Sequence, residues 1–195
     1  MPKLDAMEAV EVEVKACHKC ELWRGRKNAV PGEGNLDATV MFIGEAPGYR
    51  EDVKGQPFVG AAGKLLDEML SRVGFSRGEV YITNVVKCRP PENRDPLPSE
   101  IKTCTPYLDR QIRIIEPSFI VTLGKHAASY IFPKAGFETG SITEIHGRVY
   151  EANLLGFKVF IIPMYHPAAA LYNAKYEDEL NRDFQLLRLE LERRS

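Results

Sequence analysis

Four short apolar runs, separated by segments with helical spacing, constrain the fold of this chain more than any other feature. They lie at 39–46, 80–87, 119–124 and at the end of the stretch 147–167. That last stretch indicates a strand, a turn at Gly156 and then the buried strand. Runs that are apolar on both faces are typical of parallel strands covered by helices. The sequence therefore predicts an α/β fold, a three-layer α/β/α sandwich with a four-stranded, mainly parallel central sheet.

Apolar residues spaced three or four apart predict the helices between these strands. They indicate helices over 3–16, 61–74, 99–116 and from about 174, and a short one after Gly124. Gly74 stands where a helix C-cap is expected, and Pro106 either kinks its helix or restarts it after Thr105. No repeat or linker interrupts the pattern, so we expect one domain over 1–195.

Three loops with unusual chemistry leave the carboxyl ends of the predicted strands. They read "GEAPGYRED", "NVVKCRPPENR" and "YHPAAALYN". Ligands of open α/β sheets bind beyond these strand ends. The three loops therefore define one candidate site.

The glycine-rich stretch 42–63 raises the question of phosphate binding, but it contains neither G-x-x-x-x-G-K-[ST] nor G-x-G-x-x-G. It offers instead an acid at the strand tip, Glu45, and an aromatic, Phe58, which is either a core residue or a displayed stacking surface. Asn84 lies within an apolar strand, either as a structural amide or as a group that reads a ligand edge. His166 ends the last buried strand and should project into the site.

Four cysteines, Cys17, Cys20, Cys88 and Cys104, match a tetrahedral metal or cluster site. Structural disulfides are disfavoured in a reducing cytosol. Zn²⁺ and an iron–sulfur cluster both fit four thiolates. The second pair is spread over a loop and a helix, which favours a cluster, and the four thiols suffice without His18. The other two histidines, at 126 and 146, are expected at the surface.

The net charge of −1 excludes a general electrostatic attraction to nucleic acid, so such a partner must meet a local basic patch. Basic residues flank the cysteines and would form that patch: Lys19, Arg24, Arg26, Lys27, Lys87, Arg89 and Arg94. Because the acidic N-terminus is unlike a signal peptide and no apolar run reaches the ~18 residues of a membrane span, we expect a cytoplasmic protein without a membrane partner. Thirteen prolines and only three glutamines are typical of a thermophile.

These features resemble one family, the family 4 uracil-DNA glycosylases, the iron–sulfur branch common in archaea and thermophilic bacteria. The resemblance covers nearly the whole chain and rests on "GEAPGYREDVKGQPFVGAAGKLLD", "YITNVVKCRPPENRDP", "YHPAAAL" and the four cysteines. It implies an α/β/α sandwich, a structural [4Fe–4S] cluster with Zn²⁺ as the alternative, and hydrolysis of the N-glycosidic bond of uracil in DNA. The partner would be uracil-containing DNA, single- or double-stranded, and the product an abasic site for base excision repair.

The resemblance also implies which residues bind the substrate. Phe58 matches the aromatic that stacks on the flipped uracil, and Asn84 matches the amide that reads its Watson–Crick edge. Ala46, where some relatives have glycine, would offer its backbone N–H. Glu51 would form a wall near C5 of the base.

The same resemblance assigns the reaction to His166, Asn93 and Glu45. His166 would stabilise the leaving base, Asn93 would position the water, and Glu45 would support that geometry. Leu171 or Tyr172 would fill the place that the flipped nucleotide vacates.

Two other functions compete with this one at the level of the sequence. A metal-stabilised nucleic-acid-binding module would bind DNA without excision, and an electron-transfer protein would leave Phe58, Asn84 and His166 unexplained. We expect a monomer without a sliding-clamp motif, because "QLLRLELE" from Gln185 lacks the aromatic pair that such a motif needs.

Overall fold

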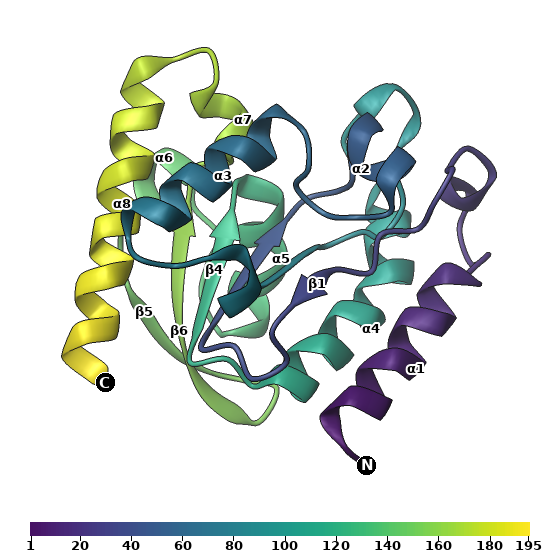
Figure 1. Cartoon of the computed structure of the whole chain (residues 1–195), viewed down its shortest axis with the longest axis horizontal. Helices are drawn as coiled ribbons and strands as arrows, with labels where there is room; N and C mark the ends of the chain where they lie inside the picture. The colour runs from purple at the N-terminus through teal and green to yellow at the C-terminus, as the bar shows by residue number, and fades with distance from the viewer.

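The computed structural model describes residues 1–195 and contains one six-stranded mixed sheet (Figure 1). The strand order is β1-β3-β2-β4-β6-β5. The four central strands run parallel: β3 (Tyr81–Asn84), β2 (Val40–Gly44), β4 (Phe119–Leu123) and β6 (Phe157–Met164). The two edge strands, β1 (Glu33–Gly34) and β5 (Tyr150–Leu154), are antiparallel to their neighbours.

The predicted number of four strands is wrong, and the sheet is only partly parallel. The two-residue β1 is too short to leave a periodic apolar signal, and one of its residues is Gly34. The strand and the turn that the sequence indicated before the last buried strand are present, and the hairpin from β5 to β6 turns through Leu155 and Gly156, both at positive φ, but β5 was not counted among the four. Since β5 lies at the edge, most of its residues stay at least partly exposed, and it lacks the continuous apolar pattern of a central strand.

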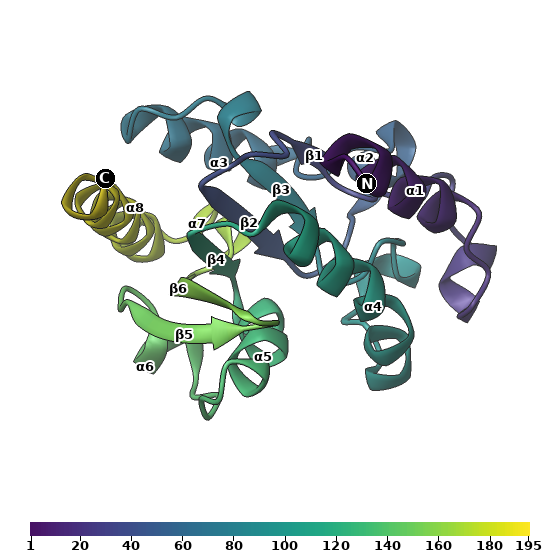
Figure 2. The same ribbon diagram turned by 90° about the horizontal axis from the view of Figure 1, so that it is seen from below.

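Helices cover both faces of this sheet, as Figure 2 shows. Met41 and Ile43 of β2 point to a core shared with α1 (Lys3–Lys15), α4 (Pro98–Ile115) and α5 (Lys125–Lys134). The alternate residues, Val40 and Phe42, point to a second core with α3 (Ala61–Arg72) and α8 (Ala174–Arg194). This period of two places one apolar set on each face, and the α/β prediction with two helical layers is confirmed.

The remaining helices are short. They are α2 (Tyr49–Lys54), α6 (Ile142–Ile145) and α7 (Pro167–Ala170), and single 3₁₀ turns lie elsewhere at Glu21–Arg24, Arg77–Glu79 and Pro91–Asn93. The helix α4 continues through the exposed Pro106, so no new helix begins there. Gly74 follows α3 at φ +85°, as expected of a helix stop. None of the helices combines the length and the apolar character that crossing a membrane requires.

Candidate functional site

A pocket of about 420 Å³ opens beyond the carboxyl ends of the parallel strands. Every residue that the sequence assigned to substrate or reaction lines it: Glu45, Ala46, Glu51, Phe58, Asn84, Asn93 and His166. Four further residues complete the lining, namely Gly48, Ala62, Asp95 and Ala168. The loops after β2, β3 and β6 therefore meet at one site, as their topology suggested.

Phe58 forms one wall of this pocket, and it is only 5% exposed. Its ring lies 5.5 Å from the His166 ring, centroid to centroid, with 27° between the planes. Two glycines make room for it. A Cβ on Gly44 would lie 2.6 Å from Phe58 Cζ, and a Cβ on Gly63 would overlap the Phe58 carbonyl. The glycine-rich stretch thus serves close packing around an aromatic ring.

The backbone of Phe58 adopts a left-handed conformation, φ +49°, which costs a non-glycine residue about 1–3 kcal/mol. Side chains hold it there. Glu51 Oε1 accepts hydrogen bonds from the N–H groups of Val59 and Gly60, both at 3.0 Å. Arg77 donates to the carbonyls of Pro57 and Phe58. Glu51 is therefore a support of the Phe58 loop as well as a part of the pocket lining.

Asn84 lies at the tip of β3 with its side chain buried, and its Oδ1 has no hydrogen-bond partner within the protein. A buried carbonyl oxygen without a partner costs about 1–3 kcal/mol. The backbone carbonyl of Asn84 accepts from Lys87 Nζ at 2.8 Å. The strand tip is thus fixed, while the amide oxygen remains free for a donor in the pocket.

His166 presents a defined tautomer to the pocket. Its Nδ1 accepts from the Ala168 N–H at 3.0 Å, so the neutral ring carries its proton on Nε2. Burial lowers the pKa of His166 to about 4, although the nearby Glu51 carboxylate opposes this shift. The imidazole is therefore a neutral Nε2–H donor at physiological pH.

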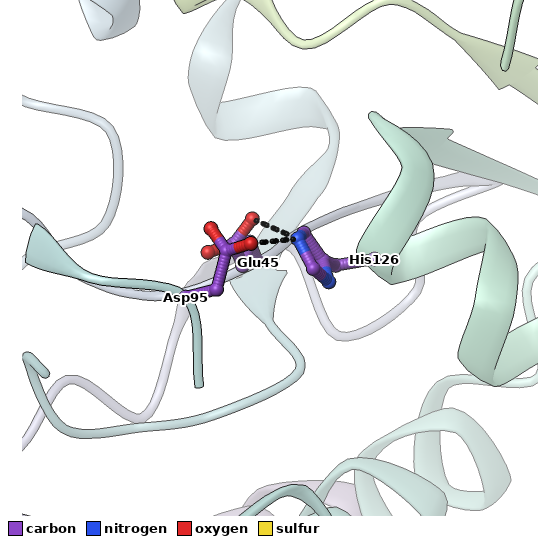
Figure 3. Close-up of side chains that lie close together, drawn as sticks. All are labelled: Glu45, Asp95 and His126. Carbon is purple, nitrogen blue, oxygen red and sulfur yellow. Dashed lines mark ion pairs between the residues drawn. The ribbon is translucent and has the colours of Figure 1, made fainter. Parts of the chain in front are cut away.

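An acidic group also borders the pocket. Glu45 from the tip of β2 and Asp95 from the loop after β3 both approach His126 Nε2 of α5 (Figure 3). Burial raises the pKa of Glu45, and the neighbouring His126 partly opposes the shift. Asn93, at φ +56°, accepts from Arg89 Nε at 2.7 Å. This side of the pocket can orient a water and stabilise a positive charge.

The four cysteines line a second, smaller cavity together with Trp23 and Tyr107. None of them forms a disulfide. Arg26 Nη1 donates to Cys88 Sγ at 3.0 Å, and the Lys87 N–H donates to Cys104 Sγ at 3.2 Å. These donors suit thiolates, so the residues fit a Cys₄ metal or cluster site.

The model of the uracil DNA glycosylase superfamily matches residues 31–188. The chain belongs to the uracil-DNA glycosylase superfamily. Within it, the chain is 52% identical over 183 residues to a type-4 uracil-DNA glycosylase of Saccharolobus solfataricus, covering 93% of this chain and 85% of that protein. It is 53% identical over 186 residues to the type-4 enzyme of Sulfurisphaera tokodaii, covering 95% and 84%. The type-4 enzyme of Thermotoga maritima is 46% identical over 173 residues, covering 89% and 87%.

The basic face expected of this uracil-DNA glycosylase superfamily member is smaller than the sequence suggested. Lys87 is fully buried, bonded to Thr83 and Gln111, and burial lowers its pKa to about 7. Arg94 is bound by Glu100. Lys87 lies inside because the chain stays buried from the end of β3 at Asn84 to Cys88, before the Pro-rich loop begins.

The exposed Lys27 and the half-buried Arg89 remain near the pocket. Their charged groups lie 5.6 Å and 5.3 Å from the centroid of the exposed Tyr49 ring, and neither forms a salt bridge.

Of the two residues expected to fill the place of the flipped nucleotide, Tyr172 is exposed, while Leu171 packs against the core on the α3 and α8 face.

The prediction that both remaining histidines lie at the surface is wrong. His126 and His146 are half-buried, each beside two carboxylates. Sequence reasoning also missed Asp95 and Arg77. One signal could have found His126: it follows Gly124, at the carboxyl end of β4, where ligands of such sheets gather.

Proposed function

We propose that this protein excises uracil from DNA by hydrolysing the N-glycosidic bond and leaves an abasic site. One observation carries the proposal: the buried Asn84 Oδ1 has no partner and lines a pocket with Phe58 and His166. The position needs a ligand that brings an N–H donor on a flat ring. Uracil presents such a donor at N3 beside an acceptor at O4.

Recognition begins when the nucleotide is flipped out of the stack, at a cost of a few kcal/mol. Stacking of the base on Phe58 stabilises the flipped nucleotide by about 1–3 kcal/mol. Asn84 Oδ1 accepts from N3–H, and its amide N–H₂ donates to O4. Cytosine presents the reversed pattern and would leave buried groups unpaired, at about 1–3 kcal/mol each. Glu51, which holds the Phe58 loop, would also lie near C5 of the base and sterically exclude the methyl group of thymine.

Hydrolysis then separates an electron-poor sugar from a uracil anion. The electron pair of the broken bond passes to the base, and charge develops at O2. The neutral His166 Nε2–H donates to that oxygen, and no proton transfer is needed. The Ala46 N–H adds a further donor. Asn93 and Glu45 hold the water whose oxygen forms the new bond to the anomeric carbon of the sugar, and the water releases a proton to solvent as the hydroxyl forms. The ionised Glu45 stabilises the positive charge of the sugar.

The Cys₄ site would hold a [4Fe–4S] cluster rather than zinc. The second pair of cysteines supports this choice, because Cys88 follows β3 in a loop and Cys104 lies in α4, whereas zinc ribbons usually use two C-x-x-C knuckles. The cluster would bind the N-terminal arm, residues 17–36, to the loop after β3 and would take no part in hydrolysis.

DNA would enter over Lys27 and Arg89, whose charges have no acidic partner. Both lie over Tyr49, which follows the pocket-lining Gly48, and Arg89 donates to the pocket-lining Asn93. Contacts of this kind to phosphates position a strand without reading its sequence. The protein would act as a monomer and as a single domain.

Incubation with an oligonucleotide that contains one uracil, followed by alkali, should cut the strand at that position. The same strand with thymine or cytosine there should stay intact. His166→Ala should lower the excision rate on the order of 10²–10³-fold while DNA binding persists. DNA binding without any strand cleavage would instead identify a non-catalytic binding module and refute the proposal.

A further inference from the structure

We propose that His126 is a positioning residue of the excision reaction. Its imidazole would hold the Glu45 and Asp95 carboxylates, and through Asp95 the Asn93 loop, on the water side of the pocket. The inference rests on the proposed function and adds to it a residue that does not itself line the pocket.

The geometry joins three separate elements at one nitrogen. His126 Nε2 lies 3.1 Å from Asp95 Oδ2 and 3.4 Å from Glu45 Oε2 (Figure 3). Glu45 follows β2, Asp95 belongs to the loop after β3, and His126 begins α5 after β4. The histidine side chain is 22% exposed and Asp95 is 63% exposed, so the rigid partner is the histidine.

The loop that carries Asn93 needs such an anchor. Glu92 and Asn93 both have positive φ, +54° and +56°, and each such residue costs about 1–3 kcal/mol. The Asp95 carboxylate forms no hydrogen bond or ion pair except the one with His126, and the same holds for the Glu45 carboxylate. Within the protein, His126 is therefore the one side chain that both carboxylates contact.

The position of His126 Nε2 explains how one imidazole can interact with both the Glu45 and the Asp95 carboxylates. Nε2 is buried and close to both carboxylates, yet it forms a well-aligned hydrogen bond with neither. It lies between them, within ion-pair distance of an oxygen of each carboxylate. Two carboxylates held this way keep negative charge facing the developing cation of the sugar.

Two substitutions of His126 test the inference through the single-turnover excision rate, measured with enzyme in excess, and through the affinity for uracil-containing DNA. His126→Leu removes the donor and should slow excision by about 10²-fold, the effect of misplacing reacting groups by about 1 Å. Its DNA affinity should stay within about twofold, since affinity depends on phosphate contacts elsewhere. His126→Gln restores an N–H near the place of Nε2 and should recover most of the rate.

His146 supplies a matched control. It also lies between two carboxylates, 2.8 Å from Asp183 and 3.1 Å from Glu179, but outside the pocket. His146→Leu should alter thermal stability and leave the single-turnover rate near that of the wild type.

A double-mutant cycle with Asp95→Asn separates positioning from a general loss of stability. If His126 acts through Asp95, the double variant should be scarcely slower than His126→Leu alone. The inference is overturned if His126→Leu excises at the wild-type rate, if only DNA affinity falls, or if the two effects simply add. An inactive wild type would refute the proposed function instead, so the two failures are distinguishable.

Discussion

At the scale of the residue, burial decides which groups of the pocket carry charge. Burial lowers the pKa of His166 to about 4 and raises that of Glu45 above its usual range. As the pH falls, Glu45 should therefore take up a proton and lose its negative charge while His166 is still neutral. We expect the single-turnover excision rate to fall on the acid side through the raised pKa of Glu45.

Comparison of pH profiles for the wild type and Glu45→Gln tests this expectation. The variant should be slow at every pH and should lack the acid limb, because Gln cannot ionise. The assignment to Glu45 fails if the variant keeps an acid limb with the same midpoint.

At the scale of the element, the loop from Pro57 to Gly60 depends on the start of α3. A Cβ on Gly63 would overlap the carbonyl of Phe58, so Gly63→Ala must displace Phe58. We expect a loss of about 1–3 kcal/mol in the free energy of unfolding and a fall in excision of about 10²-fold. Denaturant unfolding and single-turnover rates measure the two effects.

Gly78→Ala is the control for that substitution. Gly78 has open space around its Cβ position and no positive φ. Its replacement should change stability by no more than about 0.5 kcal/mol and leave excision intact. Equal rates for the two variants would mean that the loop tolerates displacement of Phe58.

At the scale of the whole molecule, the Cys₄ site joins parts of the chain that are remote in sequence. Cys17 and Cys20 come from the N-terminal arm, Cys88 follows β3, and Cys104 belongs to α4. We expect a brown protein with about four iron atoms per chain. Excision should survive a change in the redox state of such a cluster, because none of the four cysteines lines the pocket.

Cys17→Ser should lose the visible absorption band and expose residues 17–36 to limited proteolysis, while the sheet remains folded. Arg24→Gln, which affects an exposed ion pair with Glu21 beside the same cavity, should keep the band. A colourless, zinc-containing protein with full activity would contradict the cluster assignment.

Features that depend on residues close together in the chain were predictable from the sequence, and features that depend on distant contacts were not. The strands of the sheet core and the long helices were predictable, because the period of apolar residues is a local property of the chain. The edge strand β1 was not, since two residues carry no period. The same division applies to the pocket. Glu45, Asn84 and His166 stand at strand ends, so topology alone brought them together.

By itself, the sequence determined the alternation of strands and helices, the edge of the sheet where the pocket lies, and the four thiols that share one cavity. The tertiary structure alone decided that Lys87 is buried, that Glu51 and Arg77 hold Phe58 in a left-handed conformation, and that His126 lies between two acids. The physical reason is that these features depend on contacts between residues far apart in the chain, whose positions only the packed sheet and its helices define.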